Sequence, residues 1–145
     1  MKISTKGRYA VRLMLDIAQH SADGGNVSIK DVSERQGISV KYLEQIVNML
    51  SKAGYLRSRR GSQGGYRMAK EPDQYTVGDI LRVTEGDMSP VSCLEDEENP
   101  CPRVGECPTI EFWKGLYKTI NDYLDSMTIA DLMKKQDNTD YCYYI

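Results

Sequence analysis

Apolar residues recur at the spacing of an α-helix in the first stretch of the chain. Between Thr5 and His20 the repeating positions are Tyr9, Ala10, Met14, Leu15 and Ala18, and this period predicts an amphipathic helix. A turn follows, and Ser28 with Asp31 has the form of a capping box. The capping box predicts a second, shorter helix that runs to about Gln36.

A third helix is predicted after the break at Gly37, from Val40 to about Ala53, with Ser39 placed to cap it. Its apolar residues lie on one face, and they are Leu43, Ile46, Val47 and Leu50. A short helix, a turn that contains glycine and a second helix with one apolar face form a helix-turn-helix pattern. In that motif the start of the second helix meets base edges in the major groove of DNA.

Two short strands are predicted next, over residues 55–59 and 65–68, with a glycine-rich loop between them. A hairpin after a helix-turn-helix is a wing, and four arginines would flank the DNA there: Arg57, Arg59, Arg60 and Arg67. An arginine at the tip of a wing can enter a narrow minor groove. Gly61, Gly64 and Gly65 could instead hold a nucleotide phosphate, but the loop lacks the P-loop lysine and the dinucleotide spacing.

The remaining helices follow further caps. Thr76 with Asp79 predicts a helix to about Glu85. Residues 109–127 form the longest periodic segment, with an apolar stripe at Ile110, Trp113, Leu116, Tyr117, Ile120, Leu124 and Met127. We expect this stripe to pair with a second copy of the chain, and packing onto its own domain is the alternative. Thr128 with Asp131 predicts a last short helix to about Gln136.

This pattern predicts a mostly α fold with a small β-hairpin wing, a winged helix-turn-helix domain joined to a long dimerisation helix. The expected divisions are a DNA-binding domain at residues 1–85, a cysteine-rich loop at 86–108, the dimerisation and terminal helices at 109–137, and a tail at 138–145.

The charge distribution adds to this picture. The net charge of −2 alone argues against a nucleic-acid binder, but residues 1–70 hold 13 Lys and Arg against 5 Asp and Glu, a net charge of +8. Residues 71–145 hold 6 against 16, a net charge of −10. Phosphate binding needs a local basic surface, so the first half is a credible DNA-binding face. The alternative is that the two halves simply attract each other.

Polar side chains at the predicted interface have the chemistry to contact DNA. Gln and Asn can pair with adenine, Glu can accept from cytosine, and Lys can reach guanine or phosphate. The candidates are Ser39, Lys41, Glu44, Gln45 and Asn48 at the third helix, Arg59 and Arg60 in the wing, and Lys6 and Arg8 at the first helix.

The sequence contains no run near the roughly 20 apolar residues that a membrane span needs, and its first residues lack the apolar run of a signal peptide. We therefore expect a cytoplasmic protein with no membrane contact. In that compartment, clustered cysteines are more often metal ligands or redox groups than structural disulfides.

Three of the four cysteines lie close together, at Cys93, Cys101 and Cys107. Prolines, a glycine and acidic residues separate them, so no regular helix or strand is expected. A metal, a cluster, a disulfide or nothing could hold such a loop. The sequence has no CxxC pair and a single histidine, His20, so we expect no enzyme.

Taken together, several segments resemble the Rrf-type winged-helix regulators, and the similarity is greatest to their IscR branch. They are MKISTKGRYAVRLMLDIA, VSERQGISVKYLEQ, RGSQGGY, VGDILRVTEG and the cysteine loop followed by FW. The segments SPVSCLEDEE and YCYYI are more similar to the CymR branch. The resemblance extends to about residue 137.

The resemblance implies a homodimer that binds a palindromic operator in double-stranded DNA, with Glu44 and Gln45 at bases and Arg60 in the minor groove. It also implies a 2Fe–2S cluster on the three loop cysteines and control of iron–sulfur cluster biogenesis or related genes. The alternative within the family is a cluster-free regulator of cysteine or sulfur genes, with the cysteines as reactive thiols or zinc ligands. A small redox enzyme or cluster carrier is a third, less supported hypothesis.

This chain departs from the IscR pattern at the cluster. Seven residues separate the first two cysteines rather than five, and the ligand histidine falls on Ile110. The aspartate that nitric-oxide sensors of the family use falls near Arg8, where there is no carboxylate. A 2Fe–2S cluster needs about four protein donors. Glu111 is our first choice for the fourth, and the other candidates are Cys142, Glu95, Asp96, Glu97, Glu98 and His20.

Overall fold

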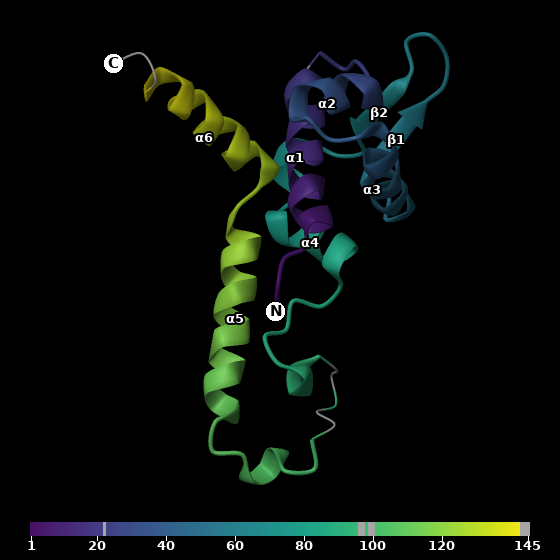
Figure 1. Cartoon of the computed structure of the whole chain (residues 1–145). Helices are drawn as coiled ribbons and strands as arrows, with labels where there is room; N and C mark the ends of the chain where they lie inside the picture. Colours follow the sequence, from purple (N-terminus) through teal and green to yellow (C-terminus); the bar gives the residue numbers. More distant parts are fainter. Residues whose placement is uncertain (22, 96–97, 99–100, 143–145) are drawn as a thin grey trace.

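Helix α1 (Thr5–His20) lies at the centre of the fold and packs against α2, α3, α4, α6 and β2 (Figure 1). The computed structural model describes residues 1–21, 23–95, 98 and 101–142, and gives no side-chain placement for 138–142. The regular elements are α1, α2 (Ile29–Gln36), α3 (Val40–Lys52), β1 (Leu56–Arg59), β2 (Gly65–Met68), α4 (Val77–Glu85), α5 (Ile110–Ser126) and α6 (Ile129–Cys142). Three short 3-10 helices join them, η1 (Pro72–Gln74), η2 (Ser92–Leu94) and η3 (Val104–Glu106). The predicted mostly α fold with a hairpin wing is confirmed.

Side-chain caps set the starts of the helix-turn-helix elements. The Ser28 hydroxyl accepts a hydrogen bond from the Asp31 backbone N–H at 3.1 Å, and the Ser39 hydroxyl accepts one from Tyr42 at 3.2 Å. Gly37 ends α2 with a φ of 66°, a left-handed conformation that glycine adopts without steric cost. These contacts fix the turn that places α3 against α1 and α2.

One hydrophobic core joins the helices and the hairpin. The four apolar residues predicted on one face of α3 are all buried: Leu43, Ile46, Val47 and Leu50. They pack with Leu13, Met14 and Ile17 of α1, and with Ile80 of α4 and Ile129 of α6. Because α6 contributes to this core, the terminal helix belongs to the same folded unit as the winged domain. No helix among the described residues is long and apolar enough to cross a membrane.

The wing is a two-stranded antiparallel hairpin whose register runs from Leu56↔Met68 to Arg59↔Gly65. The first strand begins at Leu56, one residue later than expected. The backbone N–H of Tyr55 donates instead to the Leu50 carbonyl at 2.9 Å, which closes the end of α3. Val27 extends the pairing through two hydrogen bonds of 2.8 Å with Tyr66.

We expect Gly65→Ala to destabilise the wing. Gly65 has a φ of 148°, and a Cβ there would lie 2.4 Å from the backbone oxygen of Val27, so strain and a backbone clash combine to cost about 2 kcal/mol. Gly61 is a matched control, because its φ is 109° but a Cβ would have nothing within 4 Å. Thermal unfolding followed by circular dichroism should show a larger fall in melting temperature for Gly65→Ala than for Gly61→Ala. Equal losses would mean that the contact with Val27 is unimportant.

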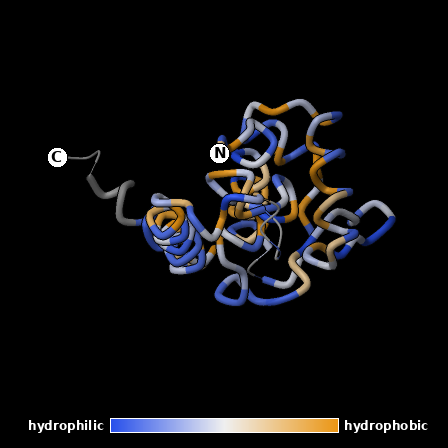
Figure 2. The backbone as a smooth tube through the Cα atoms, turned by 90° about the horizontal axis from the view of Figure 1, so that it is seen from below, coloured by the Kyte–Doolittle hydropathy of each residue, from blue (hydrophilic) through white to orange (hydrophobic). Residues whose placement is uncertain are grey.

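Helix α5 stands to one side of the winged domain, and Figure 2 shows it nearly end-on. Polar contacts fix it to α4. Arg82 donates to both carboxylate oxygens of Asp125 at 2.7 and 3.0 Å, and to Asn121 at 2.7 Å. The hydrogen bond from Arg82 lowers the pKa of Asp125. A Cβ on Gly78 would lie only 2.3 Å from Asp125 Oδ1, so glycine permits this close approach.

Helix α6 begins at the predicted cap, where the Thr128 hydroxyl accepts from the Asp131 backbone N–H at 3.1 Å. It does not end near Gln136 as predicted, and continues to Cys142. The reason is that the segment after Gln136 contains no glycine or proline that would end a helix. Most of the expected tail is therefore helical, and residues 143–145 lie outside the described part of the chain.

Candidate nucleic-acid interface and cysteine loop

The start of α3 presents the predicted base-contacting side chains to solvent. Lys41, Glu44, Gln45 and Asn48 are all exposed, and their spacing places them on one side of the helix, away from its buried face. Ser39 is also exposed, but its hydroxyl caps α3. In the structure, Ser39 therefore sets the start of α3.

The predicted basic residues lie on neighbouring elements. Arg59 and Arg60 are exposed at the end of β1 and the start of the wing loop, and Arg8 is exposed on the first turns of α1. Lys6 is half-buried there. Among the described residues, none of Lys6, Arg59 and Arg60 forms an ion pair with a carboxylate, since the ion pairs involve other cations. Their charges remain available for phosphate.

A buried ionic cluster that the sequence pattern did not reveal orients α2 on α1. Asp16 is 1% exposed. Its carboxylate accepts from Arg35 at 2.7, 3.1 and 3.2 Å and from the Gln36 side-chain amide at 2.8 Å. Arg12 in turn donates to the side-chain and backbone oxygens of Gln36 at 3.1 and 2.5 Å. We call Arg12, Asp16, Arg35 and Gln36 the orienting cluster.

The orienting cluster also contacts the recognition helix through aromatic rings. The Arg12 guanidinium lies 5.3 Å from the centre of the Tyr9 ring, a cation–π contact. Tyr9 packs edge-on against Tyr42 in the first turns of α3, with ring centres 5.6 Å apart. The position of the predicted base-contacting residues therefore depends on α1.

The N-terminal end of α1 receives a carboxylate from within the protein. Cations such as Lys6 and Arg8 are unfavourable at a helix N-terminus, where an anion is favourable. The carboxylate of Glu85, the last residue of α4, accepts from the backbone N–H and the hydroxyl of Ser4 at 2.9 and 2.5 Å. The start of α1 is thus tied to the point where the chain enters the cysteine loop.

The cysteine loop is irregular, as predicted, apart from η2 and η3. Cys93 lies within η2, Cys107 follows η3, and Cys93, Cys101 and Cys107 are all half-buried. The Thr109 hydroxyl lies 3.5 Å from the Cys107 sulfur, and this side-chain hydrogen bond lowers the pKa of Cys107. A lower pKa favours the thiolate, the form that binds metals.

The donor types fit an iron–sulfur cluster, because thiolates are its usual ligands and one iron accepts other donors. In the described residues, however, no three Cys, His, Asp or Glu side chains come together as a metal site. The side chain of Glu111 is 83% exposed and pairs with Lys114 at 3.2 Å. Gathering these donors would require the loop to rearrange.

The other candidates for the fourth ligand are not better placed. His20 Nδ1 lies 2.8 Å from the Asp16 carbonyl oxygen at the far end of α1. Glu95 and Glu98 are exposed. Asp96, Glu97 and the side chain of Cys142 lie outside the described residues.

The base of the loop is held against α5. Tyr117 donates to Asp87 at 2.5 Å, and this hydrogen bond raises the pKa of Tyr117. Together with the contact between Glu85 and Ser4, it links the entry of the loop to both α1 and α5. A change in the loop can therefore reach the helices that carry the interface.

Comparisons with known proteins agree with this arrangement. The family model described as "Rrf2: Iron-dependent Transcriptional regulator" matches residues 3–135. The chain is 46% identical to the protein rrf2 of Nitratidesulfovibrio vulgaris over 135 residues, which cover 92% of this chain and 88% of that one. It is 42% identical to the transcriptional regulator CymR of Bacillus subtilis, over the whole of both chains.

Solved structures give the same result. The structure of CymR, the global cysteine regulator of B. subtilis, superposes with a TM-score of 0.76 over 93% of this chain and 98% of that chain, at 42% identity. The structure of IscR from T. potens superposes with a TM-score of 0.77 over 99% of this chain and 97% of that chain, at 41% identity. The chain belongs to the Rrf2 family of winged-helix transcriptional regulators, a family of DNA-binding proteins rather than enzymes.

Proposed function

We propose that this regulator binds operator DNA as a homodimer, and that the loop from Cys93 to Cys107 carries the signal. In this proposal α5 pairs two copies, α3 and the wing contact each half of a palindromic site, and the loop holds a 2Fe–2S cluster. The loop's position between the winged domain and α5 is the observation that supports it most directly.

The surface of α5 supports pairing with a second copy. Only Ile110 of this helix is buried. The edge that includes Asn121, Leu124 and Asp125 faces α4. Phe112 and Tyr123 are 64% and 66% exposed, and Trp113, Leu116 and Ile120 remain partly exposed. A contiguous apolar strip of this kind on a 17-residue helix is typical of a helix that pairs.

Substitutions in α3 and the wing should separate base recognition from phosphate contact. Gln45→Ala should weaken binding to an operator selected from random DNA about tenfold and change binding to other sequences little. Arg60→Ala should weaken binding to both and reduce its salt dependence. Lys134→Gln, an exposed residue on α6, is the control. Fluorescence anisotropy at several salt concentrations measures the affinity of each variant for the operator and for other DNA. If Gln45→Ala weakens binding to all sequences equally, Gln45 makes no base contact.

For the cluster, we propose Cys93, Cys101, Cys107 and Glu111 as ligands. A bound 2Fe–2S cluster would supply a redox-active group that oxidants can destroy. The chain's own residues would transmit its presence. Ordering of the loop would act on Glu85 and Asp87 at its entry, and so on Ser4 of α1 and Tyr117 of α5.

Anaerobic purification tests this part of the proposal. The wild type should be coloured, with iron and acid-labile sulfide in equal amounts, and Glu111→Ala should lose most of the colour. Cys142→Ala tests the tail, and Glu106→Ala, an exposed acid beside Cys107, is the matched control. A colourless wild type without iron would refute cluster binding. Unchanged colour in both Glu111→Ala and Cys142→Ala would refute both candidate ligands.

A cluster-free regulator of sulfur genes is the second candidate, favoured by the full-length similarity to CymR. In that case Cys107, whose pKa is lowered by Thr109, would act as a reactive thiol or bind zinc with its neighbours. Metal analysis that finds zinc, or no metal at all, together with DNA binding that responds to thiol oxidation, would support this candidate over the first.

A further inference from the structure

A hollow of about 490 Å³ opens between the base of the wing and α6, and the proposed function leaves it unused. It is bounded by Ala18 and Ser21 at the end of α1, by Gly24 and Gly25, and by the base of the hairpin, the start of η1 and Met133 of α6. We call it the stem pocket. Its volume lies within the range of small-molecule sites. It is lined by residues of both the wing and the terminal helix, so a ligand there would touch both elements at once.

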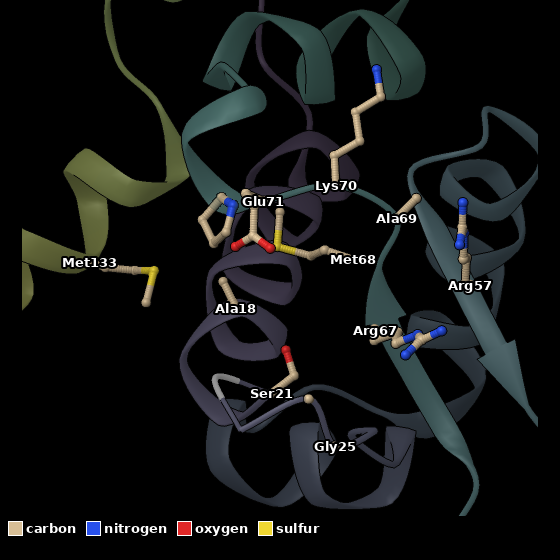
Figure 3. A pocket seen from close by; sticks show the side chains of 12 residues that line it. Ala18, Ser21, Gly25, Arg57, Arg67, Met68, Ala69, Lys70, Glu71 and Met133 are labelled. Atoms are coloured by element: carbon tan, nitrogen blue, oxygen red, sulfur yellow. The ribbon is translucent and has the colours of Figure 1, made fainter.

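One wall of the stem pocket carries unbalanced positive charge. Arg57 and Arg67 are direct partners across the antiparallel hairpin, and both line the pocket with Lys70 (Figure 3). Like charges directly opposite each other destabilise a strand pair. Among the described residues, neither arginine has a carboxylate within ion-pair distance. An anion between the two guanidinium groups would relieve this repulsion, and a carboxylate fits their planar donors.

The rest of the pocket has a different character. Glu71 provides a carboxylate, and the C-terminal end of α1 at Ser21 adds the negative end of a helix dipole. Met68 and Met133 provide apolar surface, and Figure 3 shows Met133 reaching from α6 toward Met68. A second negative charge would be unfavourable near Glu71, while an ammonium group would be favourable there.

We propose that the stem pocket binds a small zwitterion of the amino-acid type. Its carboxylate pairs with Arg57 and Arg67, its ammonium group faces Glu71, and a short apolar side chain contacts Met68 and Met133. Because the ligand contacts the hairpin and α6 together, its binding fixes the wing relative to α6 and changes the affinity for DNA. This site is independent of the cysteine loop and of the pairing of α5.

A fluorinated amino acid provides the test. The probe 2-amino-4,4,4-trifluorobutyrate should bind the full-length protein saturably at millimolar concentrations, as measured by broadening of its ¹⁹F NMR signal. Trifluorobutyrate, which lacks the ammonium group, should bind more weakly, and the amine without a carboxylate should not bind. Arg57→Gln with Arg67→Gln, and separately Glu71→Gln, should weaken binding about tenfold or more. Lys30→Gln with Lys52→Gln, two exposed lysines elsewhere, should leave it unchanged.

The alternative source of the anion is the DNA backbone, and a parallel measurement separates the two. The affinity of the same variants for a random-sequence duplex is measured by fluorescence anisotropy at several salt concentrations. If Arg57→Gln with Arg67→Gln lowers the salt dependence as Arg60→Gln does, and the wild type does not bind the amino-acid probe, the arginine pair is a DNA contact and the proposal is wrong. Absence of saturable probe binding in the folded wild type overturns it in any case.

Discussion

Replacing Leu116 and Ile120 with glutamate should convert the protein to a monomer and lower its affinity for a two-half-site operator at least about 100-fold. The two side chains lie on the partly exposed strip of α5, beside Phe112 and Tyr123. Two charges at the centre of a paired apolar surface would have to lose water without a partner. A monomer can occupy only one half-site, so the gain from simultaneous binding of two recognition helices is lost.

The control for this prediction makes an equal change in net charge, but on the polar side of α5. Lys114→Gln with Lys118→Gln changes the net charge as much as the two glutamates do, and both lysines are exposed. Light scattering after size exclusion should find a dimer for this control and a monomer for the glutamate variant. A wild-type monomer, or a glutamate variant that remains a dimer, would show that α5 does not pair as we propose. Circular dichroism should find native helix content in both variants.

The winged domain could be predicted closely from sequence because local signals decide it. Ser28, Ser39 and Thr76 each precede an apolar period, and in the structure each caps the helix that was expected. Gly37 and Gly65 mark the turn and the wing, where the backbone takes conformations that other residues resist. The predicted end of α6 near Gln136 was wrong. The apolar period stops before the helix does, and no glycine or proline marks where the helix ends.

Long-range contacts between polar groups could not be predicted in the same way. Asp16 lies between Leu13 and Ile17 on the buried side of α1, and an acid in that position is a signal that a partner exists. Nothing local identifies Arg35 as that partner, because the pairing depends on how α2 crosses α1. The contact of Glu85 with Ser4 could not be predicted for the same reason, because it depends on how α4 packs against α1. The cysteine spacing likewise defines possible ligands but not their arrangement, since three donors on one irregular loop need a bound group or another element to gather them.

Arg35→Met should be among the most destabilising single substitutions in the chain, at about 3–5 kcal/mol. It would leave the Asp16 carboxylate, 1% exposed, with the Gln36 side-chain amide at 2.8 Å as its hydrogen-bond donor and the His20 ring at 3.6 Å. A charge that stays buried after losing its partner costs most of its desolvation energy. Since a typical domain is stable by about 5–15 kcal/mol, urea unfolding at fixed protein concentration should show a large fall in midpoint.

Two comparisons make the reason for this loss testable. Asp16→Asn should cost less, about 1–2 kcal/mol, because the Arg35 side chain is 34% exposed and its charge can regain water. Arg82→Met removes an arginine with a similar hold on Asp125, but both groups of that pair are exposed at 36% and 46%, so the cost should stay below about 1 kcal/mol. Combining Arg35→Met with Asp16→Leu should restore part of the stability, because the buried charge is then absent. If Arg35→Met costs no more than Arg82→Met, the carboxylate of Asp16 reaches water when unpaired, and the orienting cluster contributes to helix placement without contributing much to stability.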